Sequence, residues 1–319
     1  MPQPTVTTLE DDLVRVTMPL PWALDHVHCY ALAGADGWTL VDTGLGTDAT
    51  LGWWREVLRG LGGPVSRIVL THYHPDHLGA SAPLAELTGA GEVVQGRLDR
   101  ELSVAAWEED DDGAFERYLR DHGMPEALAA ASARAEVGTA VHPAQPTRLV
   151  EEADELEIGG ERFRVLQLPG HADGHIALLG ERSGRLLGGD VLLEEITPNV
   201  GRWPDTARDP LGRYLHTLDR VAELAPVTVL PGHGPVIDHA AARAGEIAEH
   251  HAQRLDLTEH AVLDGATTAY DAAQVIWRAE PLGFHEQRFA LVEAISHLER
   301  LAEQGRISEP EPGRWRPSV

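Results

Sequence analysis

The 319-residue chain is long enough for one large domain, or for a core domain with a smaller appendage. Its 51 acidic residues outnumber 26 basic ones, and the net charge of −25 repels phosphate backbones, which argues against nucleic acid as a partner. The N-terminus has no basic region followed by an apolar run, and no segment approaches the ~20 apolar residues that span a bilayer. The sequence therefore predicts a cytoplasmic protein with no membrane contact.

Short β-branched segments punctuated by glycine recur through the first three quarters of the chain. They predict strands at residues 14–18, 26–32, 38–44, 67–72, 92–96, 162–170, 175–180, 185–191 and 227–234. Between them, residues 48–61 and 211–224 carry apolar side chains at helical spacing. The alternation predicts an α/β protein of stacked layers. The only cysteine, Cys29, lies in an apolar strand, where we expect a core residue and not a nucleophile.

Two stretches break this rhythm. Residues 98–140 predict a helical insertion, interrupted by an acidic turn that we expect to stay in water. From residue 239 onward, helices are predicted at 240–263, 269–279 and 287–304, followed by a short ribbon. This order predicts a winged-helix-like domain over 239–319 after a main domain over 1–238. Six side chains of its helices are expected to share one buried face: Val275, Ile276, Leu291, Ile295, Leu298 and Leu301.

The segment T-H-Y-H-P-D-H-L-G, residues 71–79, places three histidines and an aspartate within six residues. An apolar run ends just before it, so His72 and His74 fall on a loop at a strand end and, being two residues apart, can turn the same way. A proline then forces a turn, and Asp76 and His77 open a predicted helix, where the helix dipole favours an acidic residue. So many ligating groups so close together predict a metal site.

Three later predicted strands also end in a candidate ligand. His171 follows L-Q-L-P-G, Asp190 follows L-L-G-G, and His233 follows V-L-P-G. Strand ends of layered α/β domains are where binding groups gather, and glycines beside the ligands let the backbone come close. Imidazoles and carboxylates without cysteine suit zinc first, with iron or manganese as alternatives.

The first motif resembles the His-x-His-x-Asp-His signature of the metallo-β-lactamase superfamily, and L-P-G-H-A, G-G-D and L-P-G-H-G are similar to its downstream motifs. The likeness covers about residues 10–238 and implies a four-layer αβ/βα sandwich. It also implies two divalent ions held by seven side chains: His72, His74 and His171 for the first, Asp76, His77 and His233 for the second, with Asp190 bridging. The tail is similar to the winged-helix-like extension of the branch related to lactamase-β-like protein 2.

Two further side chains are expected to hold ligands in place without binding metal. Asp42, in L-V-D-T-G, resembles the family's acid that orients a ligating imidazole. His175, four residues beyond His171, is expected to play a similar supporting role.

Seven ligands around two ions leave room for water, which favours catalysis over a structural metal site. The resemblance implies a hydrolase in which a hydroxide bridging the metals attacks a carbonyl or phosphoryl centre. Asp190 sets the bridge, and Asp76 can take up the released proton and pass it to the leaving group. The ligand set is similar to that of glyoxalase II-type thioesterases, lactonases and phosphodiester hydrolases. Asp190 and the absence of an export signal argue against a true β-lactamase.

The substrate class is narrowed by charge. Residues 240–319 contain eight arginines against thirteen acidic residues, which disfavours a ribonuclease. An ester or thioester of a small molecule is therefore the favoured substrate. Two alternatives stay open: a phosphodiesterase or endoribonuclease, and a non-catalytic metal-binding regulatory protein whose winged-helix domain docks a partner.

The pocket is expected to be walled partly by the tail, packed on its own catalytic domain or on that of a second protomer in a homodimer. Six side chains are candidates for its lining: Trp22, His26, His28, Tyr73, Trp203 and Tyr214. Plain packing is an equally expected role for the two tryptophans. Tyr73 lies between two ligands and points opposite to them, which favours a core position.

Overall fold

The computed structural model describes residues 3–108, 113–137, 140–277 and 282–318. Most of the predicted acidic turn, residues 109–112, lies outside them. The chain packs into two compact units. The first contains Met1–Glu109, Ala140–Pro198 and Leu224–Ala240, and the second contains Asp110–Thr139, Asn199–Glu223 and Ala241–Val319. Because these units are defined by packing alone, the domain boundary predicted near residue 238 stays a prediction.

The first unit is built on two β-sheets. In the first sheet, neighbouring strands follow the order of the sequence. Its strands are β1 (Thr5–Glu10), β2 (Leu13–Pro19), β3 (His26–Gly34), β4 (Gly37–Val41), β5 (Val65–Leu70), β6 (Glu92–Gly96) and β7 (Arg148–Val150). Strands β1 to β4 pair antiparallel and β4 to β7 pair parallel. The parallel half brings the loops after β4 and β5 to the same edge of the sheet.

The second sheet has the order β12-β11-β10-β9-β8. Its strands are β8 (Glu155–Ile158), β9 (Glu161–Gln167), β10 (Ile176–Gly180), β11 (Arg185–Gly189) and β12 (Thr228–Pro231). Strands β11 and β12 are parallel, whereas β10 is antiparallel to both β9 and β11. Strands β9, β11 and β12 therefore run in the same direction, so the loops that follow them emerge at one edge.

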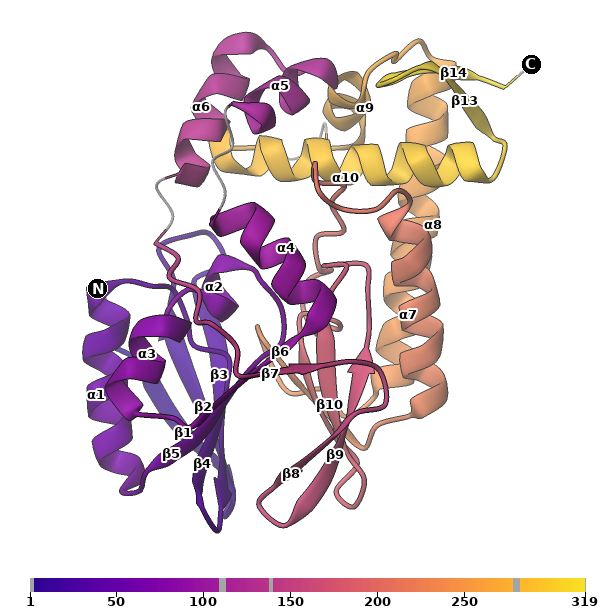
Figure 1. The fold of residues 1–319 in the computed structure, drawn as a ribbon. Coiled ribbons are helices and arrows are strands. Elements are labelled where there is room, and N and C mark those ends of the chain that lie inside the picture. Colours follow the sequence, from indigo (N-terminus) through magenta and orange to yellow (C-terminus); the bar gives the residue numbers. More distant parts are fainter. Residues whose placement is uncertain (1–2, 109–112, 138–139, 278–281, 319) are drawn as a thin grey trace. The chain divides into compact units, whose positions relative to one another are not determined.

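Apolar side chains fill both faces of the first sheet. Between the two sheets, Tyr30 and Val69 of the first sheet join one core cluster with Phe163 and Leu178 of the second. The other face of the first sheet forms a second cluster with α1 (Asp48–Leu61) and α3 (Ser81–Thr88), which lie along it (Figure 1). Cys29 is fully buried in this second cluster, as the sequence predicts for a core residue. The predicted α/β sandwich is confirmed.

The helix predicted after the histidine motif is interrupted. It consists of α2 (Pro75–Leu78) and α3, with the break at Gly79 and Ala80. The backbone N–H of Ala80 donates to the carbonyl oxygen of Gly44, 2.8 Å away, instead of continuing the helical ladder. A Cβ atom on Gly79 would lie 2.9 Å from the backbone nitrogen of Gly46. The break thus comes from the close approach of the loop after β4, which the local sequence does not encode.

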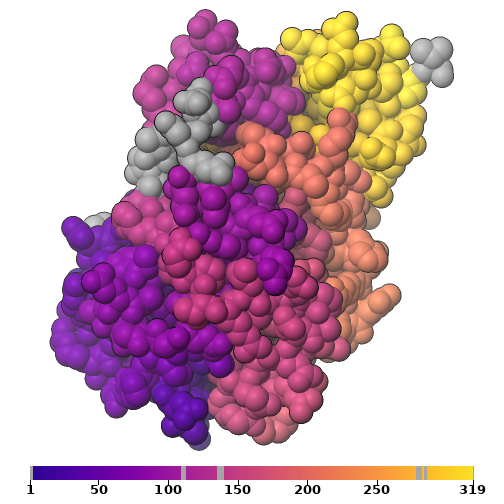
Figure 2. Space-filling view, viewed as in Figure 1, coloured from indigo at the N-terminus to yellow at the C-terminus, as the bar shows by residue number. Residues whose placement is uncertain are grey.

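The second unit is mostly helical. Its elements are α5 (Ala114–Asp121), α6 (Glu126–Val137), most of α7 (Pro210–Leu224), α8 (Ala240–Leu263), α9 (Ala269–Ile276), α10 (Phe284–Glu303), β13 (Ile307–Glu311) and β14 (Arg314–Pro317). Strands β13 and β14 form the short ribbon that the sequence predicts, at the visible surface of this unit (yellow in Figure 2). The order of helices and ribbon is confirmed, while the winged-helix assignment stays a prediction.

The predicted burial of one residue of the tail is wrong. Val275 is 46% exposed, because the buried face of α9 consists of Ala269, Ala272, Ala273 and Ile276 and places position 275 on the opposite side. The four predicted positions of α10 are buried. Among the helices of the described residues, none is long and apolar enough to cross a membrane.

Candidate metal centre

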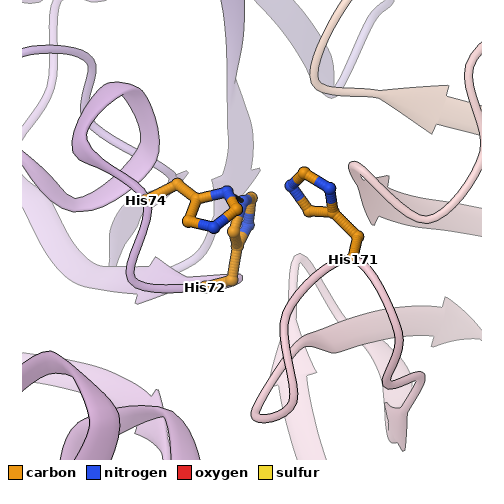
Figure 3. A group of neighbouring side chains, drawn as sticks. All are labelled: His72, His74 and His171. Carbon is orange, nitrogen blue, oxygen red and sulfur yellow. Dashed lines mark hydrogen bonds between the residues drawn. The ribbon is translucent and has the colours of Figure 1, made fainter. Parts of the chain in front are cut away.

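Three histidines from two loops form the first group of candidate ligands (Figure 3). His72 and His74 lie on the loop between β5 and α2, and His171 lies on the loop between β9 and β10. Nε2 of His72 is 3.1 Å from Nδ1 of His74. The ring centroids of His74 and His171 are 4.5 Å apart. The three rings turn toward one another (Figure 3), while their role as ligands of one ion stays a prediction.

Asp76, His77 and His233 form the second group. The first turn of α2 supplies Asp76 and His77, and His233 follows β12. Nε2 of His233 lies 3.4 Å from Oδ2 of Asp76, and Nε2 of His77 lies 3.8 Å from the same oxygen. All three side chains are buried, His77 and His233 almost completely, while Asp76 keeps 7% of its surface exposed.

Asp190, which directly follows β11, connects the two groups. Its Oδ2 lies 3.5 Å from Nε2 of His171 in the first group and 3.2 Å from Nε2 of His233 in the second. Its Oδ1 lies 3.4 Å from Nε2 of His77. Two ligand atoms at about 2.1 Å from a shared tetrahedral ion are about 3.4 Å apart, so these separations suit coordination.

The carboxylate of Asp42 orients the ligand loop from behind. Its Oδ2 accepts a hydrogen bond from Nδ1 of His77 at 2.8 Å, which leaves Nε2 of that ring turned toward Asp190. The backbone N–H and hydroxyl of Thr71 donate to the two carboxylate oxygens of Asp42, both at 2.8 Å. Asp42 adopts a left-handed backbone conformation, with φ of 62°. This geometry is the one that the sequence predicts for a group holding a ligating imidazole.

Three further histidines support the ligand loops. Nε2 of His175 accepts the backbone N–H of Asp190 at 3.1 Å. Nδ1 of His233 donates to the backbone carbonyl of His26 at 2.6 Å. Nε2 of His28 donates to the carbonyl of Gly234 at 2.9 Å while Nδ1 accepts from a threonine hydroxyl. His26 and His28 therefore contact the loop that carries His233, and His28 is only 4% exposed.

The electrostatics of the cluster fit divalent cations. Burial lowers the pKa of His74 to about 3, so its imidazole is neutral, the form that binds metals. Burial alone would lower the pKa of His233, but the carboxylates of Asp190 and Asp76 raise it to about 10. Because these carboxylates stabilise a positive charge on the ring of His233, they would also stabilise a divalent cation between them. Nε2 of His77, Nε2 of His233 and Oδ1 of Asp190 are buried without hydrogen-bond partners in the described part of the chain. Coordinated ions would satisfy all three atoms.

Glycines give the ligands the space they need. A Cβ atom on Gly232 would lie 2.3 Å from Oδ1 of Asp190 and 2.6 Å from Cε1 of His77. Gly189 has φ of 49°, and a Cβ atom there would lie 2.7 Å from Nε2 of His175. Both positions therefore require glycine, in agreement with the expectation that the backbone comes close beside the ligands.

The other predicted pocket residues lie in different environments. Trp22 is 39% exposed, whereas Tyr73 is buried in the core cluster behind the ligand loop. Trp203 and Tyr214 belong to the second unit, where Trp203 packs against Phe115 and Tyr214 is buried. Their role in a substrate pocket stays a prediction.

Sequence reasoning missed Asp99, which is fully buried in α4 (Arg97–Trp107). Its Oδ1 accepts the backbone N–H of Tyr73, between two candidate ligands, at 2.9 Å. Nε2 of Gln95 donates to its Oδ2 at 2.7 Å. A single aspartate near the start of an amphipathic helix gave no signal of this role.

The fold and the clustered imidazoles and carboxylates define a metallo-hydrolase scaffold. Residues 22–233 match the family model of the metallo-beta-lactamase superfamily, and residues 255–316 match that of the metallo-beta-lactamase-like C-terminal domain. The chain belongs to the metallo-β-lactamase superfamily, and its tail is the C-terminal domain found with that fold.

Several similar proteins match more than nine tenths of the chain. A probable metallo-hydrolase, YqjP of Bacillus subtilis, is 26% identical over 93% of this chain and 94% of its own length. The beta-lactamase-like protein 2 homolog of Caenorhabditis elegans is 23% identical over 97% of this chain and 91% of its own. The crystal structure of metallo-beta-lactamase family protein TTHA1429 from Thermus thermophilus has a TM-score of 0.86 and 35% identity, covering 97% of this chain and 100% of that one. The predicted branch is confirmed.

A further relative matches a shorter part of the chain. Hydroxyacylglutathione hydrolase of Vibrio cholerae is 31% identical over 125 residues, which make up 39% of this chain and 32% of that protein.

Proposed function

We propose that the protein is a binuclear metal-dependent hydrolase that cleaves an ester or thioester of a small molecule. The observation that carries the proposal is the position of Asp190, whose carboxylate lies within 3.5 Å of candidate ligands in both groups. His72, His74 and His171 would hold one divalent ion, zinc foremost, and Asp76, His77 and His233 would hold the other. When bound, such ions supply a water nucleophile at neutral pH and polarise the electrophilic oxygen.

The protein's own side chains hold the candidate ligands in position and transfer protons. Asp42 fixes the ring of His77, and the backbone carbonyl of His26 fixes the ring of His233, so the Nε2 atoms of both face the same carboxylates. Asp76 is 7% exposed at the rim of the cluster, within 3.4 Å of His233. Its outer position suits it to take a proton from the nucleophile and return it to the leaving group.

The thioester class is supported by two observations. The chain is 31% identical to hydroxyacylglutathione hydrolase over 125 residues, and that protein's name describes thioester cleavage. The net charge of −25 disfavours a polyanionic substrate such as RNA.

Activity assays of one protein preparation with a panel of substrates test the proposal. The full chain, supplied with Zn²⁺, is assayed with an acyl thioester, a lactone, an aryl ester and a phosphodiester. We expect kcat/KM for the best thioester or ester to exceed that for the phosphodiester by at least about 100-fold, a difference of about 2.7 kcal/mol in transition-state stabilisation. Protein treated with a chelator serves as the control and should be inactive.

Faster cleavage of the phosphodiester would replace the proposed substrate class with the phosphodiesterase alternative. Equal rates with metal-loaded and chelated protein would contradict the metal-dependent mechanism itself. Metal analysis gives an independent readout, because a cluster that holds no more than one ion under metal-replete conditions is not binuclear.

A further inference from the structure

A second set of ligand-type side chains, which includes none of the seven residues described above, lies in the second unit. His251 belongs to α8, and Glu293 and His297 belong to α10. Glu293 and His297 are four residues apart and so project from the same face of α10. One nitrogen or oxygen atom from each of the three side chains lies within 4.8 Å of the others. His251 and His297 are fully buried, and Glu293 is 9% exposed.

The two imidazoles present nitrogens to each other at a distance that suits coordination. Nδ1 of His297 donates to the backbone carbonyl of Glu293 at 2.8 Å, which leaves Nε2 of His297 with its lone pair. This Nε2 lies 3.3 Å from Nδ1 of His251. Two nitrogens bound to one tetrahedral zinc ion at about 2.05 Å are about 3.3 Å apart. The same distance also allows an N–H···N hydrogen bond, and the zinc content of the protein decides between the two.

Hydrogen bonding accounts for the cluster only in part. Nε2 of His251 is buried without a hydrogen-bond partner in the described part of the chain. The ring of His251 is held edge-on by Tyr214, with centroids 5.7 Å apart, so it is fixed in the interior. Buried polar atoms without partners are rare, and each costs about 1–3 kcal/mol. Hydrogen bonding among the described residues therefore leaves this ring nitrogen of His251 available to a ligand.

The carboxylate of Glu293 is the second reason to expect a cation. Its Oε2 accepts a hydrogen bond from the neutral amide of Asn199 at 2.7 Å. The side chain is buried, so its carboxylate is largely removed from the solvation of water. A divalent ion between the carboxylate and the two imidazoles would supply the positive charge directly.

We propose that His251, Glu293 and His297 form a separate metal site in the helical unit, which takes one divalent transition-metal ion, zinc foremost, and fastens α8 to α10. Two imidazoles and one carboxylate are a ligand set that zinc accepts, with water completing the coordination. We expect a bound ion to stabilise the fold, because it would join two helices in the interior of the unit.

Counting metal ions tests the proposal. The full-length protein is stripped with a chelator, reloaded with excess Zn²⁺, desalted and analysed for zinc and protein. We expect Glu293→Gln and His297→Gln each to hold one equivalent less than the parent chain. The matched control is His260→Gln, an exposed position on α8, which should hold as much zinc as the parent. Equal zinc contents in all four chains would overturn the proposal.

A second chain keeps the test decisive if those variants fail to fold. In this chain His72, His77 and Asp190 are replaced by alanine, which removes ligands from both groups of the seven-residue cluster. One equivalent of Zn²⁺ that stays bound and raises the midpoint of thermal unfolding supports the site in the helical unit. Loss of all zinc from this chain refutes it. The result does not depend on whether the seven-residue cluster is binuclear, so the two proposals fail separately.

Discussion

Replacing Gly232 by alanine isolates the effect of space beside the seven-residue cluster of candidate ligands. The residue directly precedes His233, and its φ lies outside the left-handed region, so alanine can adopt the same backbone conformation. Its backbone N–H donates to the carbonyl of Gly189 at 2.8 Å, and its carbonyl accepts from the backbone of His28 at 2.6 Å. Alanine leaves both hydrogen bonds in place, so any effect comes from the added methyl group.

The size of the effect follows from two distances. The new Cβ atom would lie 2.3 Å from Oδ1 of Asp190 and 2.6 Å from Cε1 of His77, about 1 Å inside van der Waals contact. Metal sites tolerate ligand displacements of about 0.2 Å. Overpacking of this kind costs about 1–3 kcal/mol in unfolding free energy. Displaced ligands should weaken metal affinity by about 10–100-fold, and a shift of about 1 Å should lower turnover by about 100-fold.

Zinc titration of the stripped protein, urea unfolding and turnover measure the three effects. Gly52→Ala is the matched control, since a Cβ atom at this position in α1 meets nothing within 4 Å. The control should bind zinc as the parent does and gain about 0.5–1 kcal/mol in stability, because alanine replaces glycine in a helix. If Gly232→Ala binds two ions in the seven-residue cluster with unchanged affinity and activity, the close approach deduced for this site is wrong.

Three further substitutions test other contacts. Asp190→Asn should keep the fold, checked by circular dichroism, but lower turnover by a few orders of magnitude, because the bridge between the two groups is weakened; near-normal kcat would count against bridging. Asp42→Asn should lower zinc affinity by about 10–100-fold in a titration, since the carboxylate no longer orients His77, whereas unchanged affinity would remove that role. Burial raises the pKa of Asp99 to about 8, so its neutral form contributes stability that is complete below its ordinary pKa and is lost as the pH rises to about 8. Asp99→Asn should therefore flatten the fall in unfolding free energy between about pH 4 and pH 8, and an unchanged pH profile in urea denaturation would contradict the buried neutral carboxyl.

The residues brought together in the seven-residue cluster could be predicted because each carries a local signal. Histidine or aspartate follows glycine at the end of an apolar strand at positions 171, 190 and 233. The common direction of β9, β11 and β12 then places these three strand ends at one edge of the second sheet. Local sequence thus fixes which residues end strands, and the antiparallel turn through β10 brings those ends together.

Long-range contacts gave no such signal. His28 reaches the carbonyl of Gly234 across 206 positions, so its supporting place could not be read from its own strand. The edge strand β1 (Thr5–Glu10) is mostly exposed on both faces, and without apolar alternation it was not predicted. The cluster of His251, Glu293 and His297 combines two helices, and no motif links its members. Each of these features depends on tertiary packing that a single sequence does not reveal.

The two kinds of metal site should differ in how fast they release their ions. In the seven-residue cluster, His171 and Asp76 are 9% and 7% exposed, so a chelator can reach its rim. In the helical unit Glu293 is 9% exposed, but His251 and His297 have no exposed surface, so the bonds from an ion to these two imidazoles should break only when α8 and α10 separate. With an excess of a coloured chelator, we therefore expect a fast phase of zinc release followed by a slower phase of about half its amplitude. Asp190→Asn should accelerate only the fast phase, and Glu293→Gln should abolish only the slow one. A single phase in the parent chain, unchanged by Glu293→Gln, would show that the helical unit holds no ion of its own.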